Sequence, residues 1–486
     1  MRTDNRRGSA LILVLIAAVF LIILTAGAYR YFQTSVDSQI WTRDRIQAKL
    51  SAEAGVNLAT HYLMGGASLP TDSTPAPILG TEMTPFVLPG DIGSVYATVD
   101  PSNENDQVTT ANAYMIRCVA YDAGEEEFGI EAIVMPENLA RFSVFMDEPS
   151  LDGYYGDGYR FDGPFYANGP IAVFSYSATH ENDVFFYSLS LTSDHYAYST
   201  FGPGVSAYAP AIGNLEMRPY ERLCLGAPYF EMSVDTIPFG SDELDWQAVR
   251  SAAQAGGLYL NSTDVPNGSR LALKNDTLFV RPTAASTATA YDLASLVNSV
   301  VWIENSVTDR FYLRSNQLPV FGLNMGLTIA TIGNIYMSGP LYYENMDPED
   351  PHNTDMLGLM TVNGNLIIAD DPGPEPAWGS ESFQITTDDS LTYCGVLVSL
   401  DGVLRAEDHW APTPTAEFRI MGGYMIKEEG YTGSSSTGFN MGVHFDPRLL
   451  YMHPPFFPTT GNWQTTMWGE RPNMTAIDVT HGIPEY

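Results

Sequence analysis

The chain has 486 residues, of which 57 are acidic and 23 basic, so its formal net charge is −34. This charge excludes functions that rest on nucleic-acid binding, because phosphates must be neutralised by lysine and arginine. Hydrophobic residues make up 45% and aromatic residues 12% of the chain, which excludes a disordered protein. The length leaves room for two or three folded domains.

An uncharged apolar run lies close to the start of the chain, from Ala10 to Tyr29. At about 1.5 Å of rise per residue, this run is long enough to cross a bilayer core of roughly 30 Å as a helix. Arg6 and Arg7 precede it, and the chain beyond residue 60 is strongly acidic. The positive-inside rule therefore places the first eight residues in the cytoplasm and the bulk of the chain outside it.

A second helical pattern follows the apolar run directly. Residues 30–63 contain no proline and a single glycine, Gly55, and apolar side chains recur at Phe32, Val36 and Ile40. This spacing is typical of an amphipathic helix. A glycine pair and a proline after residue 64 end the pattern. If continuous, residues 10–64 form a rod on the order of 80 Å long.

Two short motifs frame this helix, Arg7-Gly8-Ser9-Ala10-Leu11-Ile12 and Ala52-Glu53-Ala54-Gly55. Over residues 1–64 the chain resembles type IV prepilin-like proteins, and most of all their minor-pilin subset. The resemblance implies that a prepilin peptidase cuts after Gly8 and leaves Ser9 as the new N-terminus. Most pilins carry a glutamate at the fifth mature residue, where this chain has Leu13. Its absence suggests a tip or low-copy subunit.

The same resemblance implies where the protein works and with what. The apolar helix would stay in the mature protein and join a pilus or pseudopilus filament. The partners would be other pilin subunits, the type IV pilus or type II secretion assembly machinery, the prepilin peptidase and the membrane. The location would be the bacterial inner membrane, as a single-pass protein, or a surface filament.

Two other interpretations of the apolar run stay open. In the first, it is a secretory signal peptide with Ala26-Gly27-Ala28 as the small-residue cleavage site before Tyr29. The run is longer than the usual apolar region of about 7–15 residues, and this interpretation does not explain the second helical pattern. In the other, the run is a signal anchor that is never cut.

Beyond the helix, the sequence predicts a mainly β protein. Three β-like runs, at residues 94–99, 113–120 and 128–134, predict a small antiparallel sheet. Further on, residues 271–274 and 277–280 predict a hairpin or strand corner, 300–303 a strand, and 243–250 one or two helical turns. The expected domains are a leader at 1–8, a transmembrane and amphipathic helix at 9–64, a linker at 65–84, a small pilin-like sheet region at 85–150, a β-solenoid-like domain at 151–465 and a C-terminal tail at 466–486.

From residue 318 onward, pairs of short strands joined at a glycine repeat along the chain, with Gly333-Asn334 and Gly364-Asn365 at two of the joints. Stacked copies bury a face that one copy cannot bury alone. We therefore expect a parallel β-helix-like solenoid. A β-sandwich is the runner-up, because Asn363-Gly364 and Asp401-Gly402 are good hairpin turns.

The β-rich half also has a family resemblance. It rests on Asp162-Gly163-Pro164, on the Gly333-Asn334 segment and on His444-Phe445-Asp446-Pro447-Arg448. These motifs resemble the uncharacterised β-rich domain that follows prepilin-like leaders in bacterial envelope proteins. The resemblance implies architecture and location but no reaction. Aromatic residues around Tyr154 and Phe186 are expected in the core rather than on a sugar-binding surface.

No phosphate-binding glycine loop, nucleophile elbow or zinc signature is present. We therefore expect a structural protein, with adhesion as a further role, and no catalytic residue, cofactor or metal. The alternative is an anchored β-helix protein that binds or cleaves an extracellular polysaccharide. Its candidate acid pairs are Asp370-Asp371 and Asp388-Asp389, although the first pair precedes a proline turn.

Other candidate residues have plain structural explanations. The acidic loops at residues 347–355 and 100–106 could hold calcium, but neither has EF-hand spacing, and solvated loops are commoner. Among Cys118, Cys224 and Cys394, one pair could form a disulfide, or all three could be buried thiols. A lone histidine such as His444 is more often structural than a ligand.

Overall fold

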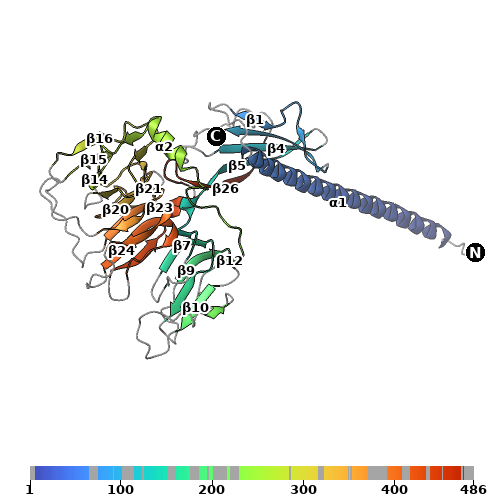
Figure 1. The fold of residues 1–486 in the computed structure, drawn as a ribbon. Helices are drawn as coiled ribbons and strands as arrows, with labels where there is room; N and C mark the ends of the chain where they lie inside the picture. Colours follow the sequence, from blue (N-terminus) through green and yellow to red (C-terminus); the bar gives the residue numbers. More distant parts are fainter. Residues whose placement is uncertain are drawn as a thin grey trace, which may run out of the picture. The chain divides into compact units, whose positions relative to one another are not determined.

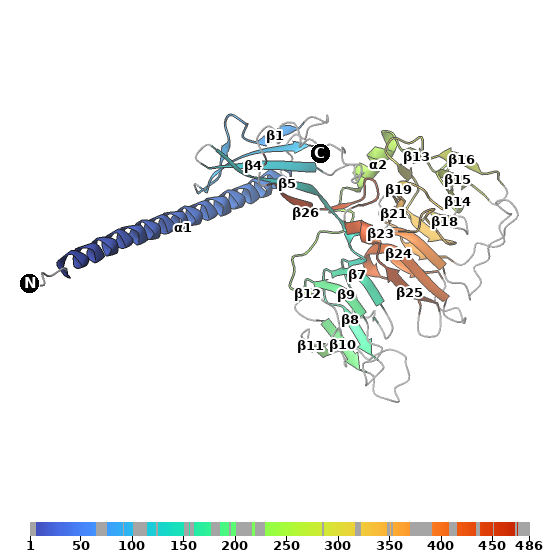
Figure 2. The ribbon, with the colours of Figure 1, turned by 180° about the vertical axis from the view of Figure 1, so that it is seen from behind.

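The computed structural model divides into two compact units, which we call the helix–sheet unit (Met1–Ser102, Ala113–Met135 and Thr465–Tyr486) and the stack unit (Asn103–Asn112 and Pro136–Gln464). Figures 1 and 2 show the elements of both units. The structure describes residues 6–64, 75–90, 92–100, 114–122, 125–149, 155, 160–175, 185–193, 196–200, 216–218, 229–283, 286–315, 322–347, 350, 353–369, 391–407, 416–433, 438–450, 452–471 and 474.

The helix–sheet unit begins with a long helix, α1 (Arg6–Met64), which confirms the continuous helix predicted from the sequence (Figure 1). Its C-terminal part packs against β3 (Ser94–Asp100) and β4 (Tyr114–Asp122). Gly55 permits this close approach, because a Cβ atom there would lie 2.5 Å from Cys118 Sγ. The buried stripe follows helical spacing; its apolar members are Ala48, Ala52, Val56, Ala59 and Leu63.

The sheet of this unit has the order β1-β3-β4-β5-β26, and β2 pairs with β3. The pairings of β3 with β4 and of β4 with β5 are antiparallel, which confirms the three strands predicted after residue 85. A linker is expected at residues 65–84, but residues 76–79 of this range form the strand β1. Leu79 of this strand is buried and pairs with Ala97 of β3. The additional strands are β1 (Ala76–Leu79), β2 (Phe86–Val87), β5 (Glu125–Asn138) and β26 (Thr459–Arg471).

β26 includes residues 466–471, which the sequence suggests are part of a tail. Arg471 Nη2 lies 3.2 Å from Glu131 Oε2, and Arg117 Nε lies 3.0 Å from the other oxygen of the same carboxylate. Glu131 is buried, so the two guanidinium groups compensate its charge. This ion-pair network holds β26 against β5.

The stack unit is built from parallel strands, paired turn above turn. One face of the stack runs through β13, β17, β19, β21, β23, β24, β6, β7, β9 and β12, each parallel to the next. The strands are β13 (Leu258–Leu260), β17 (Val300–Ile303), β19 (Gly326–Thr331), β21 (Met356–Thr361), β23 (Leu391–Ala406), β24 (Ala416–Glu429), β6 (Val144–Met146), β7 (Arg160–Ala167), β9 (Phe185–Leu191) and β12 (Tyr229–Met232).

A second face runs through β14, β18, β20, β22 and the end of β23, also in parallel. On a third face, β25 pairs with the start of β24 and with β7. Because β23, β24 and β7 bend and contribute to two faces, the strand pairings join into a closed path. These strands are β14 (Ser269–Lys274), β18 (Arg310–Ser315), β20 (Asn334–Met337), β22 (Leu366–Ile368) and β25 (Phe439–His444).

The remaining elements lie at the ends and on the outside of the stack. β14 and β15 form an antiparallel hairpin in which Lys274 pairs with Thr277, which confirms the hairpin predicted there. Val300–Ile303 is a strand, also as predicted. These elements are β15 (Thr277–Arg281), β16 (Thr289–Asp292), β8 (Ala172–Ser175), β10 (Tyr196–Thr200), β11 (Glu216–Arg218), α2 (Trp246–Gln254) and two short 3-10 helices (Leu139–Arg141 and Pro447–Leu450).

The order of turns in the stack differs from the order of the chain. The chain joins the stack at β6, in its middle, and continues through β7 and β9 to β12 at one end. A segment at residues 233–257, the strap, then leads to β13 at the other end, and the chain returns through β17 to β24. β25 follows β24 in the chain and pairs with β24 and β7, the two strands between which β6 also lies. A sequence repeat cannot reveal this order, because every turn looks alike.

Side chains inside the stack form apolar columns. One column contains Val301, Ile329, Leu359, Leu397, Tyr424, Val144, Phe165 and Leu189, each paired with the next. All are nearly or fully buried. Burial of each such side chain contributes about 1.5–3 kcal/mol, so the columns are the main source of stability of this unit.

The outward side chains of β17, β19, β21, β23, β24 and β6 are largely buried as well, because the strap and the segment around Leu449 and Phe457 cover them. Trp302 stacks on Trp246 of the strap with ring centroids 5.7 Å apart. Ser241 N donates to Asp401 Oδ1 at 3.2 Å, and Asn168 Nδ2 donates to Ile237 O at 2.8 Å. Both faces of these strands are therefore buried. This explains why apolar and polar residues do not alternate along their sequences.

The corners of the stack repeat one hydrogen-bonded arrangement. Thr361 Oγ1 donates to Gly333 O at 2.5 Å, and Ser399 Oγ donates to Gly364 O at 2.8 Å. The backbone N of Asn365 donates to Asn334 Oδ1 at 2.9 Å. The Gly-Asn joints seen in the sequence are therefore corners between parallel strands. They are not the hairpin turns that a β-sandwich would require.

Glu429, at the end of β24, brings a carboxyl group toward this apolar interior, since its partner across the strands is the buried Leu404. Burial raises the pKa of Glu429 to about 7, and a hydrogen bond to Tyr155 opposes the shift. The folded protein therefore favours the neutral form. Glu429 loses its proton less readily in the folded chain than in the unfolded chain. The free energy of unfolding therefore falls as the pH rises from the ordinary glutamate pKa of 4.5 to about 7.

Substituting Glu429→Gln is therefore expected to stabilise the protein at about pH 8, by about 2 kcal/mol, and to change little at about pH 5. Urea unfolding at the two pH values measures the difference. The matched control is Glu428→Gln, because its neighbour Glu428 is exposed. Equal effects of the two variants at the higher pH would contradict the assignment.

Candidate functional site

The N-terminal part of α1 is exposed along its described residues. Among the described residues, α1 is the helix long and apolar enough to cross a membrane, although a signal sequence meets the same criterion. Every large apolar side chain from Leu13 to Leu24 is at least 50% exposed. Leu13 itself is 69% exposed and Tyr29 63%. Gly8, Ser9 and Ala10 lie in the first turns of the same helix.

The following part of α1 is exposed as well but mixes apolar and charged residues. Phe32 and Ile40 are exposed, and the Arg45 guanidinium lies 5.2 Å from the centroid of the Trp41 ring. Gln47 Nε2 donates to Ile92 O at 2.7 Å, and Ala48 is the first buried side chain of the helix among the described residues. The helix therefore has an exposed apolar part, an exposed mixed part and a packed part.

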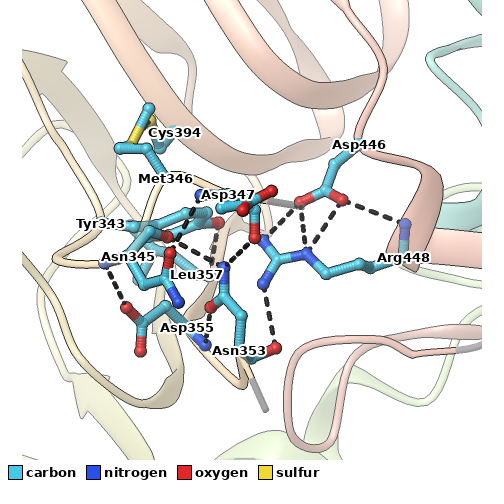
Figure 3. A network of polar contacts seen from close by, with 10 residues as sticks. All are labelled: Tyr343, Asn345, Met346, Asp347, Asn353, Asp355, Leu357, Cys394, Asp446 and Arg448. Carbon is cyan, nitrogen blue, oxygen red and sulfur yellow. Dashed lines mark hydrogen bonds and ion pairs between the residues drawn. The ribbon is translucent and has the colours of Figure 1, made fainter. Parts of the chain in front are cut away.

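A buried polar network joins two motifs singled out in the sequence (Figure 3). Arg448 is only 3% exposed, and its Nε and Nη2 atoms donate to both oxygens of Asp446 at 2.6–3.1 Å. Its Nη1 donates to Asn353 O at 3.1 Å, and its guanidinium lies 5.8 Å from the centroid of the Tyr343 ring. Burial lowers the pKa of Arg448, but the bonds and charge of Asp446 outweigh burial and raise it.

The acidic loop considered for calcium is organised by its own amides and by Arg448. Asn345 Nδ2 donates to Asp350 Oδ2 at 2.7 Å, and Asn345 N donates to Asp355 Oδ2 at 2.9 Å. Burial raises the pKa of Asp355, although the Asn345 bond opposes this shift. No group of three or more His, Cys, Asp or Glu side chains suited to a metal ion occurs in the described part of the chain. These hydrogen bonds order the described residues of the loop.

The other sequence candidates fall in different places. Cys118 and Cys394 are buried free thiols, and burial raises the pKa of Cys394 to about 12. Asp100 lies beside Arg117, at 3.5 Å. The pairs at 370–371 and 388–389, Cys224 and residues 101–106 lie outside the described residues.

The structure also locates the aromatic residues and the two charged residues of the closing motif. Tyr155, Phe165 and Phe186 form edge-to-face contacts in the core, which confirms the core interpretation for these three. His444 and Asp446, two residues apart, have different partners. His444 Nδ1 lies 3.4 Å from Asp162 Oδ2, whereas Asp446 binds Arg448. The sequence contains no signal for the Asp162–His444 pair, because it depends on the stacking of β25 on β7.

No protein-family model matches the chain, and no curated protein matches it. Among solved structures, the chain is similar to the competence-associated pilin ComZ from Thermus thermophilus, with a TM-score of 0.29 and 11% sequence identity over 88% of this chain and 97% of that one. The likeness involves a long N-terminal apolar helix followed by β-rich residues.

Proposed function

We propose that this chain is a membrane-anchored minor pilin or pseudopilin-like structural protein of a type IV pilus or type II secretion assembly. The observation that carries the proposal is the division of α1 into an exposed apolar part and a part packed on a small antiparallel sheet. The Arg7-Gly8-Ser9 motif before the apolar part supports it. The proposed role is mechanical and involves no enzymatic reaction or cofactor.

In this proposal the apolar part of α1 serves two environments in turn. Before assembly, residues 10–29 lie in the inner membrane with the bulk of the chain outside the cytoplasm. After the prepilin peptidase cuts behind Gly8, the helix leaves the lipid and packs among the helices of other subunits. Leu13 lacks the carboxylate that would pair with a neighbour's amino terminus, which favours a tip or low-copy position.

The stack unit is proposed to be a β-solenoid of the parallel β-helix type and to act as the exposed head. Its support is the parallel pairing of successive turns and the ladder of corner hydrogen bonds. Such a body presents an extended surface while each turn contacts only its neighbours. Contact with a partner or adhesion to a surface would be the task of this head.

The mature N-terminus tests the proposal. We expect intact-mass and N-terminal sequencing of the membrane-extracted protein to give Ser9, and Gly8→Val to leave residues 1–8 attached. The matched control is Ala28→Leu, which alters the alternative signal-peptide site and should leave processing at Ser9 unchanged. A mature N-terminus at Tyr29 would overturn the proposal, and a wild-type chain that stays uncut would support the signal anchor instead.

A further inference from the structure

The outer surface of the stack carries a group of polar side chains that neither the core nor the corners use. It lies where β24, β25 and β7 stack. Phe418 and Val443 face the interior, so their neighbours along each strand face outward. These outward residues are Glu417, Arg419, Gly442, His444 and Asp162, with side-chain exposures between 32% and 48% for the four that have side chains.

His444 is oriented by a carboxylate. Its Nδ1 lies 3.4 Å from Asp162 Oδ2, which favours the tautomer with the proton on Nδ1. The other ring nitrogen, Nε2, then carries a lone pair and faces away from Asp162. Metal-binding histidines in proteins are commonly held in this way, with the second nitrogen bonded to a carboxylate.

Gly442 leaves open the space that Nε2 faces. A Cβ atom on Gly442 would lie 3.9 Å from His444 Nε2 and 3.9 Å from Glu417 Oε1, with no other described atom beyond its chain neighbours within 4 Å. Arg419 Nη2 donates to the other oxygen, Glu417 Oε2, at 2.5 Å. Glu417 Oε1 and His444 Nε2 therefore border the same open space above Gly442.

We propose that His444 Nε2 and Glu417 Oε1 bind a divalent transition-metal ion of the Zn²⁺ or Cu²⁺ class above Gly442, with Asp162 as the positioning residue. Imidazole nitrogen selects these ions over Ca²⁺ and Mg²⁺, which prefer oxygen ligands. The net charge of −34 raises the local concentration of cations. Two protein ligands leave the remaining positions to water. The site is independent of the pilin-like role.

Titration calorimetry with Zn²⁺ alone, on the tag-free full-length protein in detergent, tests the site. We expect one saturable event that weakens about tenfold in Asp162→Asn and by more than that in His444→Gln. Gly442→Val keeps both ligands but fills the space between them, and should also weaken binding.

His61→Gln is the matched control, since His61 is exposed at the end of α1 and should leave the titration unchanged. Excess Ca²⁺ should not displace Zn²⁺. The proposal is overturned if the wild-type protein shows no saturable Zn²⁺ binding, if His444→Gln binds as the wild type does, or if Ca²⁺ competes equally, because binding would then follow only from the acidic surface.

Discussion

Replacing Gly364 with alanine is expected to lower the free energy of unfolding by about 3 kcal/mol or more, because overpacking against fixed neighbours is costly. A Cβ atom on Gly364 would clash with the carbonyl group of Gly333 and lie 2.7 Å from Asn334 N. These are backbone atoms of the adjacent turn. They cannot move away without breaking the corner hydrogen bonds and the pairing of β20 with β22. Urea unfolding followed by circular dichroism measures the loss.

Gly326→Ala is the matched control for this prediction, because Gly326 is a glycine of the same unit that lies at the start of β19 and not at a corner. A Cβ atom there would meet only ordinary contacts, the nearest at 3.6 Å from Pro455 Cγ. Its effect should stay within about 1 kcal/mol, the range of a tolerated glycine-to-alanine change. Similar losses for the two variants would show that close stacking of the corners does not limit the stability of the head.

Replacing Arg448 with methionine is expected to destabilise the protein by about 3–5 kcal/mol, because it removes one partner of a buried ion pair. Methionine preserves most of the volume of the side chain. It leaves the Asp446 carboxylate without its cation and Asn353 O without the donor that holds the acidic loop. Thermal unfolding and limited proteolysis of the loop at residues 345–355 measure the two consequences.

Two further variants test this explanation, one at a separate exposed ion pair and one at the network itself. Arg419→Met removes a guanidinium that is 45% exposed, and such surface pairs contribute less than about 1 kcal/mol. Arg448→Met combined with Asp446→Asn should be more stable than Arg448→Met alone, since the second change removes the uncompensated charge. If the double variant loses the sum of the two single losses, the pair is not coupled as the structure indicates.

The elements that the sequence predicts correctly are those with local causes. The helix through Gly55, the hairpin at Asn275 and the joints at Gly333-Asn334 and Gly364-Asn365 each depend on residues a few positions apart. Asn275 lies in the left-handed region of backbone conformation, at φ 52°, as a tight hairpin turn requires. Local chemistry of this kind is visible in the printed sequence.

What the sequence does not predict depends on residues far apart. Trp246 and Trp302 stack only because the strap runs back along the whole row of turns. Arg448 donates a hydrogen bond to the backbone carbonyl of Asn353, which lies 95 residues earlier in the chain. The Asp162–His444 pair spans the point at which the chain closes the stack on itself. A single sequence contains no periodic signal for any of these contacts.

The closing of the stack at its middle turn determines where strands can be gained or lost by duplication or deletion. Thr460 Oγ1 donates to Glu137 Oε2 at 2.7 Å, and Leu139 N donates to Pro458 O at 3.3 Å, so the two ends of the stack unit lie side by side. In chain terms the whole head is one insertion between two neighbouring strands, β5 and β26. Turns duplicated or deleted at β12 or β13 would alter the reach of the head and leave this junction untouched.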